Sequence, residues 1–216
     1  MVGMKNILKA ISKSLGNEIT EDMDLLKVIG KVTNNKDVKS IVNSVNSNQV
    51  MSKEWLVDTI KPKLELMDNP RICVAAGWYG QLADRLREYT DEKVVSFDMD
   101  PKCAEIGKIL YPEVKFETQT IEEFDPTKFD VIICTSCEHI TDKTINDFIA
   151  KRKKVGLNRS NKTFVVLQSN DYYGLDEHVN CKRNLNEFKW SIKMNIINSL
   201  EKRINDKFNR FMLVGY

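Results

Sequence analysis

Short apolar runs alternate with amphipathic stretches along most of the chain. The runs Ile72–Ala76 and Val131–Cys134 are apolar throughout, which is typical of strands buried on both faces of a parallel sheet. Between such runs, apolar residues recur every three or four positions, as in Gln81–Arg87 and Lys102–Leu110, a pattern that predicts helices. Strands alternating with helices predict an α/β fold with a mostly parallel sheet.

Seven strands are expected in all, and the last two are joined by the short polar link Asn205–Lys207. We therefore predict five parallel strands followed by an antiparallel hairpin. The predicted strands are Ile72–Ala76, Lys93–Asp98, Lys115–Thr118, Val131–Cys134, Thr163–Gln168, Ile196–Ile204 and Phe208–Val214, and two further helices are expected at Asp142–Val155 and Leu185–Met194.

Residues 1–50 carry no strand pattern. Apolar spacing predicts three short helices there, at Lys5–Leu15, Asp22–Val32 and Asp37–Val45. We interpret residues 1–50 as a helical N-terminal subdomain and residues 51–216 as the main domain. The subdomain could cap a substrate site, mediate dimerisation or simply brace the fold, and the sequence leaves these alternatives open.

The main domain opens with a further predicted helix, Ser52–Ile60. Ser52 is a residue type that favours the N-cap position. Pro62 is expected to end this helix or to lie just beyond it, because proline disfavours helical geometry in the preceding residue.

Composition narrows the class of partner. The formal net charge of +2 on 216 residues gives no global field, so nucleic-acid binding stays open but is not indicated by charge. No apolar run approaches the roughly 20 residues that span a bilayer, and the N-terminus lacks the apolar core of a signal peptide. We expect a cytoplasmic protein that does not enter membranes; its oligomeric state is unknown.

The five cysteines are an odd number, which favours reduced thiols over a disulfide framework. Cys134 and Cys137 have Cys-x-x-Cys spacing, but no second pair completes a zinc site. A mixed set of Asp171, Glu177, His178 and Cys181 has no regular metal-ligand spacing. We expect no metal.

The first candidate site is the turn after the strand Ile72–Ala76. Gly77 and Gly80 can take backbone angles closed to other residues and let a ligand approach the main chain. Asp98 ends the next strand, at about the 20-residue spacing where an acid meets a nucleotide ribose. Asp100 is better explained as the cap of the helix that follows.

A ligand without phosphate fits this turn best. Trp78 and Tyr79 fill the turn, and Asp84 in the first turn of the next helix would repel a phosphate.

At these motifs the sequence resembles the class I S-adenosylmethionine-dependent methyltransferases, over roughly Ser52–Tyr216. Val74–Gly80 resembles their glycine-rich first motif, Phe97–Pro101 the second, and Phe129–Ile140 the fourth, with its Glu-His-hydrophobic ending. The Gly-Trp-Tyr-Gly form also resembles a group of phage and bacterial methyltransferase-like proteins.

The resemblance implies a Rossmann-like class I methyltransferase fold and S-adenosylmethionine as cofactor. It implies methyl transfer to an unidentified small molecule or nucleotide-type substrate. The implied cofactor-binding residues are Ala76, Gly77, Trp78, Tyr79, Gly80, Asp98, Met99, Thr120, Ile121, Cys134 and Ser136.

The sequence departs from the family pattern at two places. Ala75 and Ala76 stand where the first motif usually opens with an acid, and Thr120 stands where an acid usually contacts the adenine. These departures favour a non-catalytic adenosyl-ligand binding protein as one alternative. Another use of the same cofactor, aminocarboxypropyl transfer or cofactor cleavage, is a second.

The second candidate site combines two segments that follow neighbouring strands, Cys137–His139 and Ser169–Cys181. Ligands of open α/β sheets bind beyond the carboxyl ends of the strands, so we expect these segments to converge there, beneath the N-terminal helices. They carry both histidines of the chain. The candidate catalytic residues are His139, Asp171 and His178, with Glu138 or Asp171 orienting a histidine base, and the candidate substrate-binding residues are Glu138, Asn170, Tyr172 and Tyr173.

Overall fold

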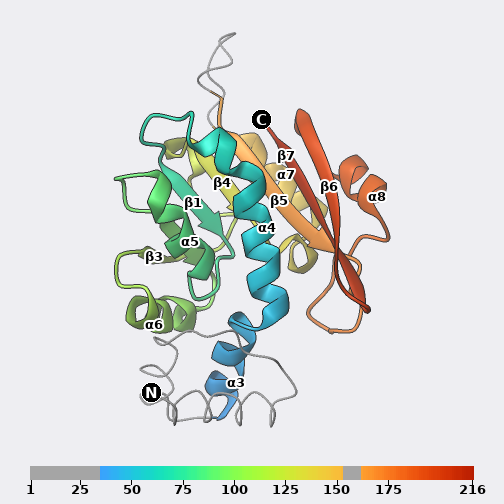
Figure 1. Ribbon diagram of the computed structural model, residues 1–216, viewed down its shortest axis with the longest axis horizontal. Coiled ribbons are helices and arrows are strands. Elements are labelled where there is room, and N and C mark those ends of the chain that lie inside the picture. The colour runs from blue at the N-terminus through green and yellow to red at the C-terminus, as the bar shows by residue number, and fades with distance from the viewer. Residues whose placement is uncertain (1–34, 153–161) are drawn as a thin grey trace.

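The computed structural model describes residues 35–152 and 162–216. Within these ranges, seven strands form one mixed sheet in the order β3-β2-β1-β4-β5-β7-β6 (Figure 1). The neighbours from β3 to β5 are parallel, whereas β7 runs antiparallel to both β5 and β6. The predicted fold class is confirmed, namely a mostly parallel Rossmann-like sheet with an antiparallel C-terminal hairpin.

The strand ends agree with the predicted ones to within two residues. The strands are β1 Ile72–Ala75, β2 Val95–Asp98, β3 Lys115–Thr118, β4 Val131–Cys134, β5 Phe164–Asn170, β6 Ile196–Asn205 and β7 Phe208–Gly215. One difference affects the site. Ser169 and Asn170 were expected in a loop, but they extend β5 because they pair with Phe211 and Arg210 of β7.

The helices are α3 Asn35–Ser44, α4 Ser47–Leu64, α5 Gln81–Arg85, α6 Pro101–Leu110, α7 Asp142–Lys151 and α8 Leu185–Ser191, with 3-10 turns at η1 Leu86–Tyr89, η2 Pro126–Lys128 and η3 Cys137–His139. Asp100 caps α6 as predicted, because its side chain accepts a hydrogen bond from the Lys102 N–H. The part of the predicted helix Asp142–Val155 beyond residue 152 lies outside the described residues.

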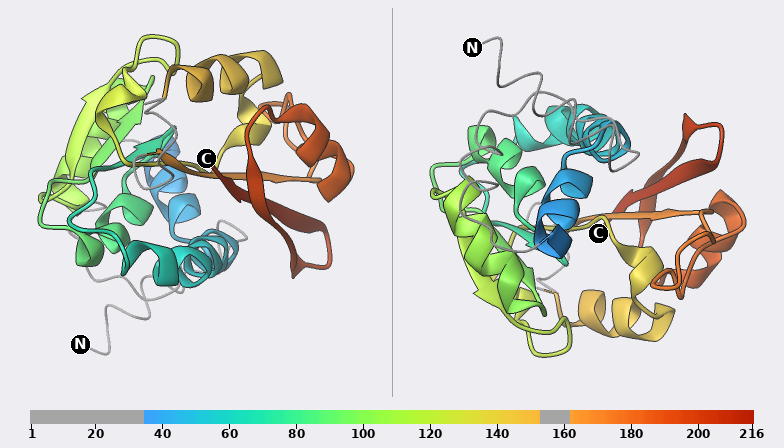
Figure 2. Two further views of the ribbon diagram at one scale, coloured as in Figure 1. Left: turned by 90° about the horizontal axis from the view of Figure 1, so that it is seen from above. Right: turned by 90° about the horizontal axis from the view of Figure 1, so that it is seen from below.

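Helices cover both faces of the sheet (Figure 2). Alternate strand residues point to opposite faces, so Ile72 and Val74 of β1 pack with α4, α5 and α6, whereas Cys73 and Ala75 pack with α7 and α8. Two apolar layers result, one on each side of the sheet. Both are needed because the central parallel strands are buried on both faces.

Helix α4 differs from its prediction at both ends. It begins at Ser47, capped by the side chain of Asn46, so Ser52 lies inside the helix and not at its cap. Pro62 also lies inside, and the helix continues to Leu64. Tertiary packing explains the continuation, because Ile60 and Leu64, on either side of Pro62, are fully buried against the sheet.

The predicted helix Asp37–Val45 is confirmed as α3. The other two helices predicted before it, Lys5–Leu15 and Asp22–Val32, lie outside the described residues. Helix α4 runs across residue 50, so the division of the chain at that residue stays a prediction.

All five cysteines are free thiols. Burial raises the pKa of the Cys137 thiol, so Cys137 is a packed, protonated side chain. Over the described ranges, the structure contains no helix that is both long and apolar enough to cross a membrane.

The strand order reverses between β1 and β4, because β2 and β3 lie on one side of β1 and β5 on the other. A doubly wound sheet binds its ligand at such a switch point, beyond the carboxyl ends of the strands. Helix α3 lies at the end of the molecule toward which the parallel strands point (Figure 1).

Candidate functional site

The turn after β1 has an unusual backbone. Ala76 and Trp78 have positive φ angles of 48° and 51°, which non-glycine residues rarely adopt, and Gly80 has a φ of 88°. In a non-glycine residue such as Ala76 or Trp78, this conformation costs roughly 1–3 kcal/mol and persists where the surrounding structure holds it, often at ligand sites.

Packing within the protein explains the two glycines of this turn. A Cβ atom at Gly77 would lie 2.2 Å from the Ser96 Oγ, and one at Gly80 would lie 2.5 Å from the Phe116 ring. The sequence interpretation assigned the missing side chains to ligand approach. The structure shows that both are already required by contacts between β1, β2 and β3.

Asp98 lies at the end of β2, directly beside the turn. Its Oδ2 accepts a hydrogen bond from the Trp78 N–H at 3.1 Å, and its Oδ1 accepts one from the Asp100 N–H at 3.2 Å. Asp98 is half-buried, so lone pairs on both oxygens stay available to further donors. The turn and the carboxylate therefore form one unit, while the binding of a ribose by Asp98 stays a prediction.

Four other predicted cofactor residues lie at the carboxyl ends of the strands, near the turn. The Ser136 Oγ donates to the Ala76 carbonyl at 3.4 Å, which joins the ends of β4 and β1. Met99 follows Asp98 and is 74% exposed, whereas Thr120 and Ile121 form a half-buried turn after β3.

Two of the predicted cofactor side chains point elsewhere. The Tyr79 hydroxyl donates to the Ser40 Oγ of α3 at 2.8 Å, so the ring of Tyr79 packs toward α3. Cys134 is buried in the apolar layer beneath α7. These two residues can reach a ligand only through their backbone.

The two segments of the second candidate site converge, as predicted. The Asn180 N–H donates to the Glu138 carbonyl at 2.8 Å, and the Asn180 side chain donates to the Ile140 carbonyl at 2.6 Å. His139 bonds the Glu177 carbonyl through its Nδ1 at 3.0 Å. The loop after β5 is thus fastened to the 3-10 turn η3 after β4.

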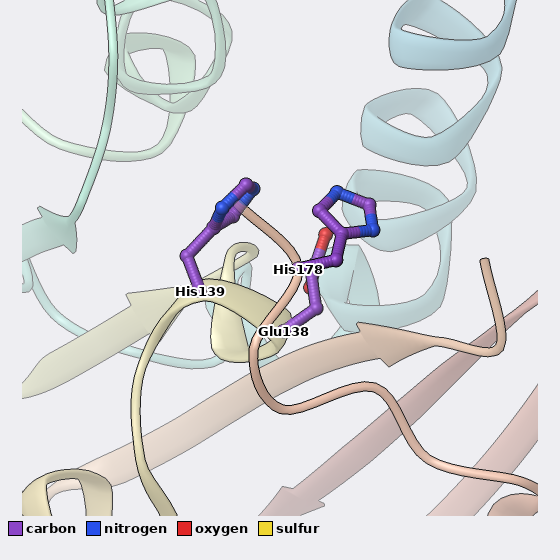
Figure 3. A group of neighbouring side chains, drawn as sticks. All are labelled: Glu138, His139 and His178. Carbon is purple, nitrogen blue, oxygen red and sulfur yellow. The ribbon is translucent and has the colours of Figure 1, made fainter. Parts of the chain in front are cut away.

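The histidine rings are neighbours in this arrangement (Figure 3). Their centroids are 4.7 Å apart and their planes nearly perpendicular, at 86°. The Nδ1 of His178 lies 2.6 Å from the Tyr172 carbonyl. A carbonyl oxygen only accepts hydrogen bonds, so in both rings Nδ1 carries the proton and, in the neutral form, Nε2 keeps its lone pair.

Glu138 lies below the rings in a buried ion pair that the sequence did not reveal. Its Oε1 accepts from the Arg210 Nη1 at 2.7 Å and from the Asn170 Nδ2 at 2.7 Å. Its Oε2 is buried without a hydrogen-bond partner. Arg210 also donates from its Nη2 to the Thr135 carbonyl at 2.6 Å.

Helix α4 completes this network. The Ser52 Oγ donates to the Gln168 Oε1 at 3.1 Å and accepts from the Arg210 Nε at 3.1 Å. Ser52, Gln168, Arg210, Glu138 and Asn170 are all buried. We call these five residues the buried polar network.

The next residue of α4, Lys53, is also buried. Its Nζ donates to the Gln81 Oε1 at 2.8 Å and to the Ser44 carbonyl at 3.2 Å. Burial, with a smaller effect of the charges on Arg210 and Arg85, lowers the pKa of Lys53 to about 7. A neutral amine has two N–H groups, which match these two acceptors.

The structure places the remaining predicted residues less favourably. Both carboxylate oxygens of Asp171 accept hydrogen bonds from Asn209, so Asp171 faces the hairpin and does not orient a histidine. Asn170 is buried and holds Glu138, so its amide does not face a substrate. Tyr172 packs edge-on against the His178 ring, and Tyr173 is 60% exposed.

The sequence analysis missed Arg210 and Gln168 and gave Ser52 a different role. One signal was present. Arg210 directly precedes the apolar run 211–214, where a cation on the inner part of a strand needs a buried partner.

The sheet order, the switch point and the closing hairpin define the class I methyltransferase fold. No protein-family model matches the chain, and no curated protein sequence matches it. The solved structures that resemble it show the same fold at low sequence identity.

Magnesium protoporphyrin IX methyltransferase from Synechocystis PCC 6803, with bound S-adenosylmethionine, is similar with a TM-score of 0.58 and 13% identity. The match covers 89% of this chain and 90% of that one. Geranyl diphosphate C-methyltransferase from Streptomyces coelicolor A3(2), in complex with Mg²⁺, geranyl diphosphate and S-adenosyl-L-homocysteine, is similar with a TM-score of 0.57 and 10% identity, over 92% of this chain and 89% of that one.

Proposed function

We propose that the protein is an S-adenosylmethionine-dependent methyltransferase acting on a small molecule. The observation that carries the proposal is the Asp98 carboxylate, held beside the strained turn after β1 at the switch point of the sheet. The two similar enzymes, whose structures contain S-adenosylmethionine or its product, support the same assignment.

The residues present fit an adenosyl ligand. Asp98 offers acceptors for both ribose hydroxyls, and charge-assisted bonds of this kind contribute about 1.5–3 kcal/mol each. Met99 is apolar yet exposed next to Asp98, where it can cover a purine ring. Thr120, Ile121 and Ser136 border the same edge of the sheet.

The cofactor supplies an activated methyl group on a sulfonium. The protein then needs mainly to align an acceptor with that carbon, because proximity and orientation account for much of the rate. The segment Cys137–His139 follows β4, which neighbours β1, and the loop 171–181 follows β5, the next strand, so both lie at the same edge of the sheet as the turn. The Nε2 lone pairs of His139 and His178 can take up the proton that an acceptor loses.

Several finer assignments belong to this proposal. They are a cytoplasmic location, a small-molecule or nucleotide-type acceptor, and the likeness to phage and bacterial proteins with the Gly-Trp-Tyr-Gly motif. The two similar enzymes are named for small-molecule substrates, which favours the small molecule.

Calorimetric titration of the full chain with S-adenosylmethionine tests the cofactor. Asp98→Asn should weaken binding by roughly 10- to 150-fold, the loss of one charge-assisted bond. Asp100→Asn is the matched control, because asparagine caps α6 as well as aspartate and the charge removed is two residues away. Equal affinities for all three proteins would refute the assignment of Asp98 to the ribose, and tighter binding of NAD than of S-adenosylmethionine would refute the cofactor assignment.

Mass spectrometry of the spent cofactor tests the reaction. Adenosylhomocysteine indicates methyl transfer. Methylthioadenosine would indicate aminocarboxypropyl transfer or cofactor cleavage instead, and binding without any turnover would indicate a binding protein.

A further inference from the structure

Glu138, His139 and His178 each offer a ligand atom, and these atoms lie within 4.8 Å of one another. They come from two segments, η3 and the loop after β5, and Figure 3 shows the Glu138 carboxylate below the imidazole ring of His178. We propose that these three residues bind one divalent transition-metal cation of the Mn²⁺, Fe²⁺ or Zn²⁺ kind. This inference replaces the sequence expectation of no metal.

The imidazole rings are arranged as metal ligands usually are. A metal-binding histidine donates its second ring N–H to a carbonyl or carboxylate, which fixes the tautomer and the ring direction. Here the Nδ1 of His139 bonds the Glu177 carbonyl and the Nδ1 of His178 bonds the Tyr172 carbonyl. Both Nε2 atoms keep a lone pair for a cation.

Glu138 provides the second, independent observation. Only 3% of the residue is exposed, and Arg210 and Asn170 hold its Oε1. Its Oε2 is the only charged atom among the three buried side-chain oxygens without a partner in the described part of the chain. Leaving such an atom unsatisfied is unfavourable, and a coordinated cation would satisfy it.

The charges around the site indicate which cation. Arg210 already balances the Glu138 carboxylate, and the two imidazoles are neutral ligands. Ca²⁺ and Mg²⁺ prefer sites made of several oxygens, often carboxylates. Two imidazoles with one carboxylate suit borderline metals such as zinc or iron instead.

Three protein ligands leave coordination positions open. Glu138 is buried, His178 is half-buried and His139 is exposed, so the open side faces away from the sheet. Resting on the proposed function, an acceptor with a hydroxyl oxygen would bind there, because a cation lowers the pKa of a bound hydroxyl. With both Nε2 lone pairs on the cation, that oxygen would release its proton to water and not to a histidine, and would form a bond to the methyl carbon as the carbon–sulfur bond breaks.

The test uses the full chain without a histidine tag, stripped of metal with a chelator and titrated with Mn²⁺ alone. Electron paramagnetic resonance of free Mn²⁺ should show one bound ion per chain. His139→Ala is the deciding variant, since its exposed side chain can be removed without disturbing the core. It should weaken Mn²⁺ binding by roughly tenfold or more. His178→Ala and Glu138→Gln should weaken Mn²⁺ binding to a similar extent.

Glu177→Gln is the matched control, because it removes an exposed carboxylate next to His178 and keeps the backbone carbonyl that bonds His139. Its affinity should equal that of the wild type. The chain has only two histidines, so ¹⁵N-histidine labelling gives two imidazole spin systems, and Zn²⁺ should shift Nε2 in both.

The site is overturned if the wild type neither binds Mn²⁺ nor shows the Zn²⁺-dependent shift of Nε2, or if His139→Ala binds the metal as well as the wild type does. Titration of the metal-free protein with S-adenosylmethionine separates the two proposals. Intact cofactor binding without binding of either metal refutes only the metal site, whereas metal binding without cofactor binding refutes only the proposed function.

Discussion

The two halves of the candidate site are built in different ways. The turn after β1 owes its shape to the backbone, through the positive φ angles of Ala76, Trp78 and Gly80. The half around Glu138 owes its shape to side chains that meet from four elements, and the Arg210–Ser52 bond joins residues 158 positions apart. A local, strained backbone thus lies beside a long-range, buried polar network.

The two halves also differ in how much free energy a substitution should cost. Backbone strain in the turn is a modest cost spread over a few residues. In the network, a single deletion leaves an uncompensated charge in the interior, which is far more costly. We therefore expect the network to be less tolerant of substitution than the turn.

The largest expected effect is that of Arg210→Ala. It leaves the Glu138 carboxylate and the Thr135 carbonyl buried without their donor, and removing one partner of a buried pair typically costs about 3–5 kcal/mol. Urea unfolding measures the change. Arg203→Ala, an exposed arginine of the same hairpin, is the control and should change stability by about 0.5 kcal/mol or less. If Arg210→Ala lost less unfolding free energy than a substitution in the turn after β1, such as Gly80→Ala, the network would be the more tolerant half of the site.

Lys53 makes the stability depend on pH. Its folded-state pKa of about 7 lies below the unfolded value of about 10.4, so between these values only the unfolded state binds the proton. Stability contributed by Lys53 should rise with pH across this window, by at most about 1.4 kcal/mol per pH unit, and level off above it.

The measurement is the difference in unfolding free energy between wild type and Lys53→Met at pH 7 and pH 10. Relative to Lys53→Met, the wild type should have a higher unfolding free energy at pH 10 than at pH 7. Lys61→Met, an exposed lysine of the same helix, should show no such shift. Parallel pH curves for wild type and Lys53→Met would mean that Lys53 stays charged in the fold.

The turn is tested through two glycines that contact one ring. A Cβ at Gly80 or at Gly107 would meet the end of the Phe116 ring at 2.5 or 2.4 Å, but only Gly80 also has a positive φ. Either alanine variant should cost about 1–3 kcal/mol through overpacking. Phe116→Leu should relieve Gly107→Ala more completely than Gly80→Ala, as double-mutant cycles in urea unfolding would show. If Phe116→Leu restored the stability of both alanine variants equally, the backbone conformation at Gly80 would make no separate contribution to the loss.

The smallest expected effect is that of Tyr79→Phe, which removes the bond to Ser40 of α3. The loss should be about 0.5–1.5 kcal/mol, the net value of one hydrogen bond. Tyr173→Phe, at an exposed ring, should leave the unfolding midpoint unchanged. A larger loss for Tyr79→Phe than for Gly80→Ala would show that α3, and not the backbone of the turn, holds this half of the site.

The same difference explains what could be predicted from the sequence. The strands, the turn and the Asp100 cap depend on residues close together in the chain, so local patterns were sufficient. The meeting of His139 and His178 followed from a topological rule, since their segments leave neighbouring parallel strands at the same edge.

Arg210 and Ser52 were beyond such reasoning. Nothing near Ser52 in the sequence distinguishes a helix cap from a buried partner of a distant arginine, and packing of α4 moved its start to Ser47. Asp171 was misjudged for a related reason. Its neighbours in sequence are site residues, but its partner Asn209 belongs to the hairpin.

The long sequence separations in the network also set an order of events in folding. A nascent chain presents α4 and β4 well before β7, so Glu138 exists for a time without its arginine. A carboxylate without a partner resists burial, and contacts between distant residues carry a large loop-closure cost. The turn after β1 can therefore take its native form early. The buried polar network beneath the histidines becomes native only when β7, the last strand of the sheet, docks.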